Sequence, residues 1–216
     1  MRAAPSSIAI DGPAASGKSS VSRALAARCG YRFLDTGLMY RAFTLAAIRA
    51  NVPPTEEACA SFAEEIDLRI GDETEAHVYL GAEDVTHKLH NRELESHVSS
   101  YARLAPVRAA LIKRQRAYAH RWRSVLAGRD IGEVVLPDAP LKIYLDADEN
   151  ARARRRNKER GVGHQEAQES QQALSRRDRL DAPQTYISPD AVVIDTSALT
   201  LEEVIDRVLE LASCGA

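Results

Sequence analysis

Residues 12–19 read GPAASGKS, which satisfies the phosphate-binding pattern GxxxxGK(S/T) at every fixed position. The apolar run Ile8–Ile10 precedes this loop and a helical pattern follows it, as the motif requires. Glycines let backbone N–H groups converge on phosphate oxygens, and the positive end of the following helix points the same way. The segment therefore predicts a strand–loop–helix unit that binds a nucleoside triphosphate with Mg²⁺.

Within this loop we expect Lys18 to reach the outer phosphates and the Ser19 hydroxyl to be a magnesium ligand. The expected nucleotide-binding residues are Gly12, Pro13, Ala14, Ala15, Ser16, Gly17, Lys18, Ser19 and Ser20. A switch GTPase is disfavoured, because Asn157-Lys158 is followed by Glu159-Arg160 and so lacks the aspartate that selects guanine. The sequence also has no DxxG motif.

Short apolar runs alternate with helical patterns along most of the chain. Strands are expected at 8–10, 31–34, 124–127, 141–145 and 191–194, and helices at 38–50, 107–123 and 201–211. This alternation predicts an α/β fold, with a three-layer core around a parallel five-stranded sheet. Residues 66–89 have the pattern of short antiparallel strands with turns at Gly71-Asp72 and Gly81, and a helical stretch follows at 92–104.

The composition of the chain argues against several classes of function. The chain has 29 Lys+Arg and 31 Asp+Glu, a formal charge of −2, which argues against a general nucleic-acid coat. Its three cysteines are scattered without metal-binding spacing, which indicates reduced thiols. The first residues are too polar for a signal peptide, and the apolar stretch Ala42–Ile48 is far shorter than the roughly 18 residues of a spanning helix. We therefore expect a cytoplasmic protein without a membrane segment, and a monomer.

Polar residues end each predicted strand, at the sheet edge where open α/β folds bind ligands. Asp11, Asp35-Thr36 and Gly128–Asp130 are the informative cases, whereas Asp146 and Asp195 are taken as ordinary strand ends. Arginines beside a hydroxyl or carboxylate suit a phosphorylated, hydroxyl-bearing acceptor. Each of these segments, taken alone, is better explained as a surface ion pair or a helix cap.

Together with the phosphate-binding loop, these segments resemble the bacterial cytidylate kinases. The matching stretches are IDGPAASGKSS, LDTGLMYR, VRAALIKRQR, GRDIGEVVLPDAPLKIYLDA, RRDRLDAP and VVIDT, so the resemblance runs from Ile8 to about Leu211. It implies transfer of the γ-phosphate of ATP to CMP or dCMP, with Mg²⁺. It also implies that the inserted sheet is a monophosphate-binding domain and that a helical lid covers ATP.

The resemblance assigns roles to particular residues. Lys18, Arg41 and Arg129 are expected to supply the catalytic positive charge. The residues expected at the acceptor are Arg41, Arg129 and Thr36 for its phosphate, Ser99, Arg108 and Asp130 for the cytosine base, and Arg177 and Asp181 for the sugar. In the lid, the candidates are Arg152, Arg155 and Arg156, which belong to a cluster of basic residues at 152–160.

The resemblance also suggests how the single domain 1–216 is divided. The expected core comprises about 1–65, 105–150 and 176–216, with the insertion at about 66–104 and the lid at about 151–175. Two positions depart from the family pattern. Ala127 stands where many relatives have a carboxylate, and Gln184 stands where an arginine often contacts the acceptor phosphate.

Three other functions remain open from the residues alone. The chain could phosphorylate another acceptor, such as UMP, AMP or a small metabolite. It could bind ATP as a regulatory module without transferring phosphate, or bind nucleic acid through the basic cluster at 152–160.

Overall fold

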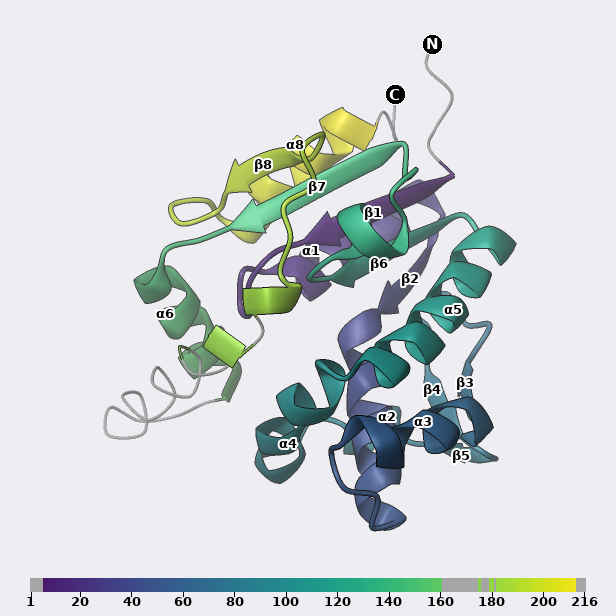
Figure 1. Cartoon of the computed structure of the whole chain (residues 1–216). Helices are drawn as coiled ribbons and strands as arrows, with labels where there is room; N and C mark the ends of the chain where they lie inside the picture. Colours follow the sequence, from purple (N-terminus) through teal and green to yellow (C-terminus); the bar gives the residue numbers. More distant parts are fainter. Residues whose placement is uncertain (1–5, 161–174, 176–178, 181, 213–216) are drawn as a thin grey trace.

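A computed structural model of the chain describes residues 6–160, 175, 179–180 and 182–212. Its centre is a five-stranded parallel sheet in the order β2-β6-β1-β7-β8 (Figure 1). The strands are β1 (Ser7–Asp11), β2 (Arg32–Asp35), β6 (Ser124–Gly128), β7 (Leu141–Asp146) and β8 (Val192–Asp195). All five lie within a residue or two of the positions that the sequence predicts, so the predicted parallel sheet is confirmed.

Helices cover both faces of this sheet, because apolar side chains point in both directions along its strands. In β1, Ile8 and Ile10 pack in one core with α1 (Lys18–Cys29) and α8 (Leu201–Ala212). Ala9, between them, belongs to the core on the other face, with Met39 and Phe43 of α2 (Thr36–Arg49) and Leu111 of α5 (Ala105–Arg121). The structure is therefore the expected three-layer arrangement.

The insertion forms the antiparallel sheet that the sequence predicts. Its strands are β3 (Leu68–Ile70), β4 (Val78–Leu80) and β5 (Glu83–Asp84), in the order β3-β4-β5. A 3-10 turn at Thr86–Lys88 leads to α4 (Arg92–Ala102), whose N-cap Asn91 accepts a hydrogen bond from the Leu94 amide at 2.7 Å. Val78 and Leu94 belong to the same core as α2 and α5. The insertion is thus packed onto the helices of one face.

Besides short 3-10 turns, a helix and a π-helical turn among the described elements are absent from the sequence-based prediction. One is α3 (Glu56–Glu65), which buries only the small side chains of Cys59 and Ala63 and so has no wide apolar stripe to reveal it. The other is a π-helical turn at Ile131–Val135, which follows β6. Contacts with Asp11, distant in sequence, hold the start of that turn.

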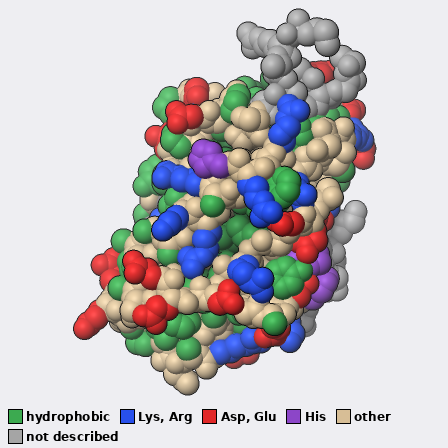
Figure 2. Space-filling model, turned by 90° about the vertical axis from the view of Figure 1, so that its right-hand side faces the viewer, with side chains coloured by type: hydrophobic (Ala, Val, Ile, Leu, Met, Phe, Trp, Pro, Cys, Tyr) green, Lys and Arg blue, Asp and Glu red, His purple; other side chains and the backbone are tan. Residues whose placement is uncertain are grey.

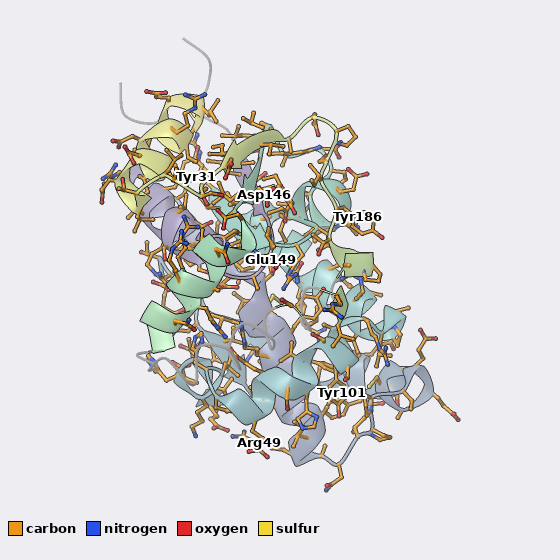
Figure 3. All side chains as sticks on the ribbon, turned by 90° about the vertical axis from the view of Figure 1, so that its left-hand side faces the viewer. Tyr31, Arg49, Tyr101, Asp146, Glu149 and Tyr186 are labelled. Atoms are coloured by element: carbon orange, nitrogen blue, oxygen red, sulfur yellow. The ribbon has the colours of Figure 1, made fainter. Side chains whose placement is uncertain are left out.

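The start of the predicted lid is helix α6 (Glu149–Arg160), which follows β7. Figure 3 shows Asp146 and Glu149 where the strand leads into this helix. Residues 161–174 lie outside the described residues, so the extent of the lid and the division of the chain remain predictions.

On one face of the molecule, acidic and basic side chains are interspersed (Figure 2). Elsewhere in the described residues, exposed side chains form ion pairs such as Arg23–Glu75, at 2.6 Å, and Arg49–Glu83, at 2.7 Å. Among the described helices, none combines the length and the apolar character needed to cross a bilayer.

Gly12 is required where the chain leaves β1. Its φ is 150°, and a Cβ added there would lie 2.2 Å from the Leu145 carbonyl oxygen of neighbouring β7. Gly17, in the same loop, also has a positive φ, of 96°, but an added Cβ would meet nothing within 4 Å.

We therefore expect Gly12→Ala to lower the free energy of unfolding by about 2 kcal/mol more than Gly17→Ala, because only the first forces β7 to move. Urea unfolding of both variants measures the difference. Equal losses would show that backbone conformation alone, and not the contact with β7, requires glycine at position 12.

Candidate active site

The loop between β1 and α1 is shaped to receive an anion. Gly17 is the N-cap of α1, and the first turn of that helix has no acidic residue to compete for its free N–H groups. The Lys18 ammonium group folds back over the loop and donates a hydrogen bond to the Pro13 carbonyl at 2.5 Å. Phosphate oxygens placed before this helix would meet both the amides and the ammonium group.

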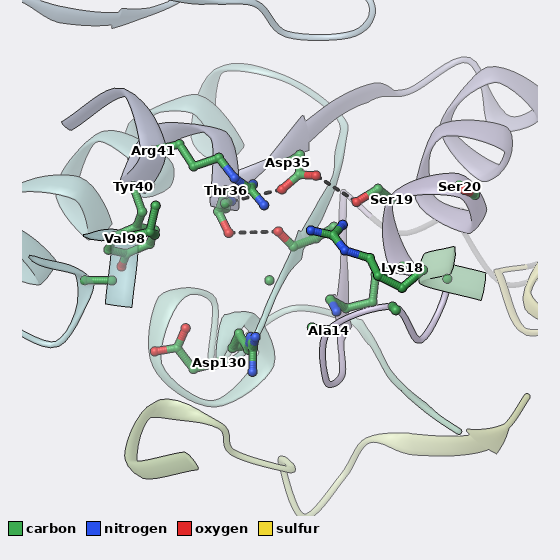
Figure 4. A pocket seen from close by; sticks show the side chains of 18 of the residues that line it. Ala14, Lys18, Ser19, Ser20, Asp35, Thr36, Tyr40, Arg41, Val98 and Asp130 are labelled. Carbon is green, nitrogen blue, oxygen red and sulfur yellow. Dashed lines mark hydrogen bonds between the residues drawn. The ribbon is translucent and has the colours of Figure 1, made fainter. Parts of the chain in front are cut away.

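A cavity of about 200 Å³ extends from this loop to the carboxyl ends of β2 and β6. Figure 4 shows Lys18, Thr36, Arg41 and Asp130 around this one space. The lining residues that the sequence predicts as functional are Ala14, Ala15, Gly17, Lys18, Ser19, Ser20, Thr36, Arg41, Arg108, Arg129, Asp130 and Arg156. The loop and most of the predicted acceptor residues therefore face the same cavity.

Two oxygen-bearing side chains meet beside Lys18. The Ser19 hydroxyl donates a hydrogen bond to Oδ2 of Asp35 at 2.7 Å (Figure 4). The other oxygen of Asp35 accepts from the Gly37 amide at 2.9 Å and caps α2. The cap holds the carboxylate in place, with one oxygen turned toward the phosphate-binding loop.

The far end of the cavity is built around a buried ion pair between Arg108 and Asp130. Burial raises the pKa of the Asp130 carboxyl, and the Arg108 guanidinium offsets part of that rise. Close by, Thr36 donates a hydrogen bond to the Ala127 carbonyl at 2.8 Å. A paired carboxylate and guanidinium at the base of a cavity can recognise a polar ring through both donors and acceptors.

Asp11 joins the two ends of the site. Its carboxylate accepts hydrogen bonds from the amides of Ile131 at 2.8 Å and Gly132 at 2.7 Å, directly after Arg129 and Asp130. Burial raises the pKa of Asp11 to about 6. Asp11 also directly precedes Gly12, so one side chain ties the phosphate-binding loop to the turn that carries two predicted acceptor residues.

The three arginines predicted for the lid have different surroundings. Arg152 donates to the Ala147 carbonyl at 3.1 Å and to the Ala14 carbonyl at 3.3 Å. Arg155 donates to both the hydroxyl and the carbonyl of Thr196, at 2.9 and 2.5 Å. Of the three, only Arg156 lines the cavity, where it donates to Glu95 of α4 at 2.5 Å. Arg152 and Arg155 therefore tie α6 to the backbone of the core in this conformation.

Other predicted site residues either do not line the cavity or lie outside the described residues. Ser99 is buried on α4 but is not among the residues that line the cavity. Arg177 and Asp181 lie outside the described residues, and nothing is described of the Gln184 side chain. Ala127, the other departure from the family pattern, lines the cavity.

The sequence does not point to Tyr40 or Glu95 individually. Tyr40 lines the cavity, and Glu95 contacts Arg156, which lines it. Helical spacing carries a signal for Glu95, because Ser99 lies four residues later and Ala102 seven residues later on the same face of α4.

A phosphate-binding loop that shares one cavity with several arginines and a buried Arg–Asp pair is the site of a P-loop kinase. The family model described as "Cytidylate kinase" matches residues 8–214. The chain belongs to the cytidylate kinase family.

Individual proteins agree with this assignment. The cytidylate kinase of Roseiflexus castenholzii is 42% identical over 215 residues, covering 95% of this chain and 93% of that protein. That of Mycobacterium leprae is 42% identical over 212 residues and covers 94% of each. A solved shikimate kinase from Bacteroides thetaiotaomicron shares the fold, with a TM-score of 0.51, 12% identity, and coverage of 96% of this chain and 98% of that one.

The raised pKa of Asp11 predicts how stability changes with pH. Because the folded-state pKa of about 6 lies above the ordinary 3.8, the folded chain binds more protons than the unfolded chain between these values. The contribution of Asp11 to stability therefore falls as pH rises from about 4 to about 6. We expect the wild type to lose stability over this range relative to Asp11→Asn, measured by urea unfolding at each pH. If the free energies of unfolding of the two proteins changed in parallel with pH, the raised pKa of Asp11 would be contradicted.

Proposed function

We propose that the chain transfers the γ-phosphoryl group of ATP to the phosphate of CMP or dCMP, giving ADP and CDP or dCDP. The observation that carries this proposal is the single cavity, which has a phosphate-binding loop at one end and Arg41, Arg129 and the Arg108–Asp130 pair at the other. Membership of the cytidylate kinase family supports the choice of donor and acceptor.

In the proposed reaction, an oxygen of the CMP phosphate attacks the γ-phosphorus as the bond to the β-phosphate oxygen breaks, and ADP leaves. The acceptor is already anionic, so no strong general base is required. The transition state is loose, and the protein's task is to hold the groups in line and to stabilise negative charge. Lys18 serves the donor phosphates, and Arg41 and Arg129 serve the acceptor phosphate.

The base of the acceptor is the group that distinguishes CMP from other nucleotides. We assign Arg108 and Asp130 to its recognition, since a guanidinium donates hydrogen bonds and a carboxylate accepts them from the exocyclic amine of cytosine. Ser99 of α4 is assigned to the same group, and Arg177 and Asp181 to the sugar. We assign Thr36 to the acceptor phosphate.

Magnesium is the proposed cofactor, and the oxygen donors present suit it. Ser19 and Asp35 place a hydroxyl and a carboxylate 2.7 Å apart beside the loop, and Mg²⁺ prefers such hard oxygen ligands. Among the described residues, no group of three His, Cys, Asp or Glu side chains could hold a metal. The ion would therefore be held jointly by Ser19, Asp35 and the nucleotide. When bound, it neutralises charge on the β- and γ-phosphates.

We also propose that the segment at about 151–175 is a lid that excludes water from ATP when it closes. Its base, α6, already borders the cavity through Arg156. A cytoplasmic location agrees with the free, buried thiol of Cys59. We also propose that the protein acts as a monomer.

A coupled ADP-release assay with ATP and Mg²⁺ tests the reaction. CMP, dCMP, UMP, AMP, GMP and dTMP are supplied separately, and we expect strong turnover with CMP and dCMP alone. Lys18→Ala should lower kcat at least about a hundredfold, because it removes charge that stabilises the transition state. Turnover with a different acceptor would show that the substrate assignment is wrong. If no acceptor supported turnover, the result would favour an ATP-binding module that transfers no phosphate.

The role of Asp130 is tested by its variant Asp130→Ala. We expect the KM for CMP to rise at least about tenfold and the KM for ATP to change less than about twofold, because a buried partner of the base is lost. Asp138→Ala, at an exposed position after the π-helical turn, is the matched control. Equal effects on both substrates would count against a base-reading role.

A further inference from the structure

Three charged side chains from three separate elements meet at the edge of the cavity. Oε1 of Glu95 on α4 lies 2.5 Å from Nη2 of Arg156 on α6 and 3.9 Å from Nη2 of Arg41 on α2. One carboxylate oxygen therefore faces two guanidinium groups. The three elements belong to the predicted insertion, lid and core.

These contacts are shielded from water. The exposed fractions of the side chains are 11% for Arg41, 17% for Glu95 and 22% for Arg156. Shielded charges interact more strongly than surface pairs, for which the usual contribution is small. Without Glu95, the guanidinium groups of Arg41 and Arg156 would repel each other across this gap.

The arrangement leaves the arginines available to a ligand. Arg41 and Arg156 line the cavity, whereas Glu95 is not among its lining residues. The carboxylate therefore holds the two guanidinium groups from outside the space that the nucleotides are proposed to occupy.

We propose that Glu95 is a positioning residue for phosphoryl transfer, which holds Arg156 of the lid helix beside Arg41 at the acceptor end of the cavity. This inference rests on the proposed function. In-line transfer depends on charge placed where the transferring group passes, so misplaced guanidinium groups slow the chemical step. The carboxylate also links insertion and lid, so the two arginines are brought together only when both parts are in place.

The test is a double-mutant cycle with Glu95→Gln and Arg156→Gln. In the otherwise wild-type enzyme, Glu95→Gln should lower kcat with CMP about tenfold and change the KM for ATP less than about threefold. In the Arg156→Gln background, the same change should lower kcat less than about twofold, because its main partner is already absent. Equal tenfold losses in both backgrounds would overturn the proposal, since additive effects show that Glu95 and Arg156 act independently.

Two further variants sharpen the result. Glu95→Asp keeps the carboxylate on a shorter arm and should recover at least about threefold of the lost kcat. Glu93→Gln, at an exposed position on the same helix, makes the same change in charge and should leave kcat within about twofold. Failure of Glu95→Asp to recover activity, or an equal loss in Glu93→Gln, would also overturn the proposal.

The wild-type assay separates this proposal from the proposed function. If the wild type does not phosphorylate CMP, the substrate assignment fails, and the same cycle is then run with the acceptor that does support turnover. If the wild type phosphorylates CMP and Glu95→Gln leaves kcat unchanged, only the role of Glu95 fails.

Discussion

The carboxylate of Asp11 is the interaction on which the geometry of the site depends. It ends the central strand, and the next residue begins the phosphate-binding loop. Its two oxygens hold the amides of Ile131 and Gly132, so the turn that carries Arg129 and Asp130 is fixed relative to that loop. The end of β1 therefore fixes the positions of both the phosphate-binding loop and the turn after β6. Burial of this carboxylate disfavours its charged form, and for this reason its pKa is raised.

Several arginines at the cavity each face a carboxylate. Arg108 pairs with Asp130, and Glu95 faces both Arg41 and Arg156. Buried guanidinium groups without such partners would be expensive, since the desolvation of each ion must be offset. The pairs let the folded chain hold several arginines around one small space before any phosphate enters.

Much of this architecture follows from local sequence patterns. Strands such as β1 and β6 are buried on both faces, so they are continuous apolar runs that are visible in the sequence. The phosphate-binding loop has a fixed spacing because Gly17 and Lys18 must occupy set places at the start of α1. The residues after β2 and β6 could be expected to converge because the carboxyl ends of parallel strands share one edge.

The rest depends on contacts between residues far apart in sequence. Nothing in the arginine-rich segment 152–156 distinguishes Arg152, which donates to the Ala147 and Ala14 carbonyls, from Arg156, which lines the cavity. The two partners of Glu95, Arg156 and Arg41, lie on other helices, so their contacts with it appear only in the folded structure. The π-helical turn depends in the same way on Asp11, because its own residues do not encode the carboxylate that holds it.

The strand order has a consequence for how the protein is made. In the sheet, Ser7 of β1 pairs with Ser124 of β6, and Ile8 pairs with Leu141 of β7. Both neighbours of the first strand are therefore synthesised long after it. During translation, the phosphate-binding loop leaves the ribosome before β6 and β7, so β1 has no neighbouring strand until β6 has emerged. Such distant pairings slow folding, and the nascent chain must keep an apolar strand from aggregating in the meantime.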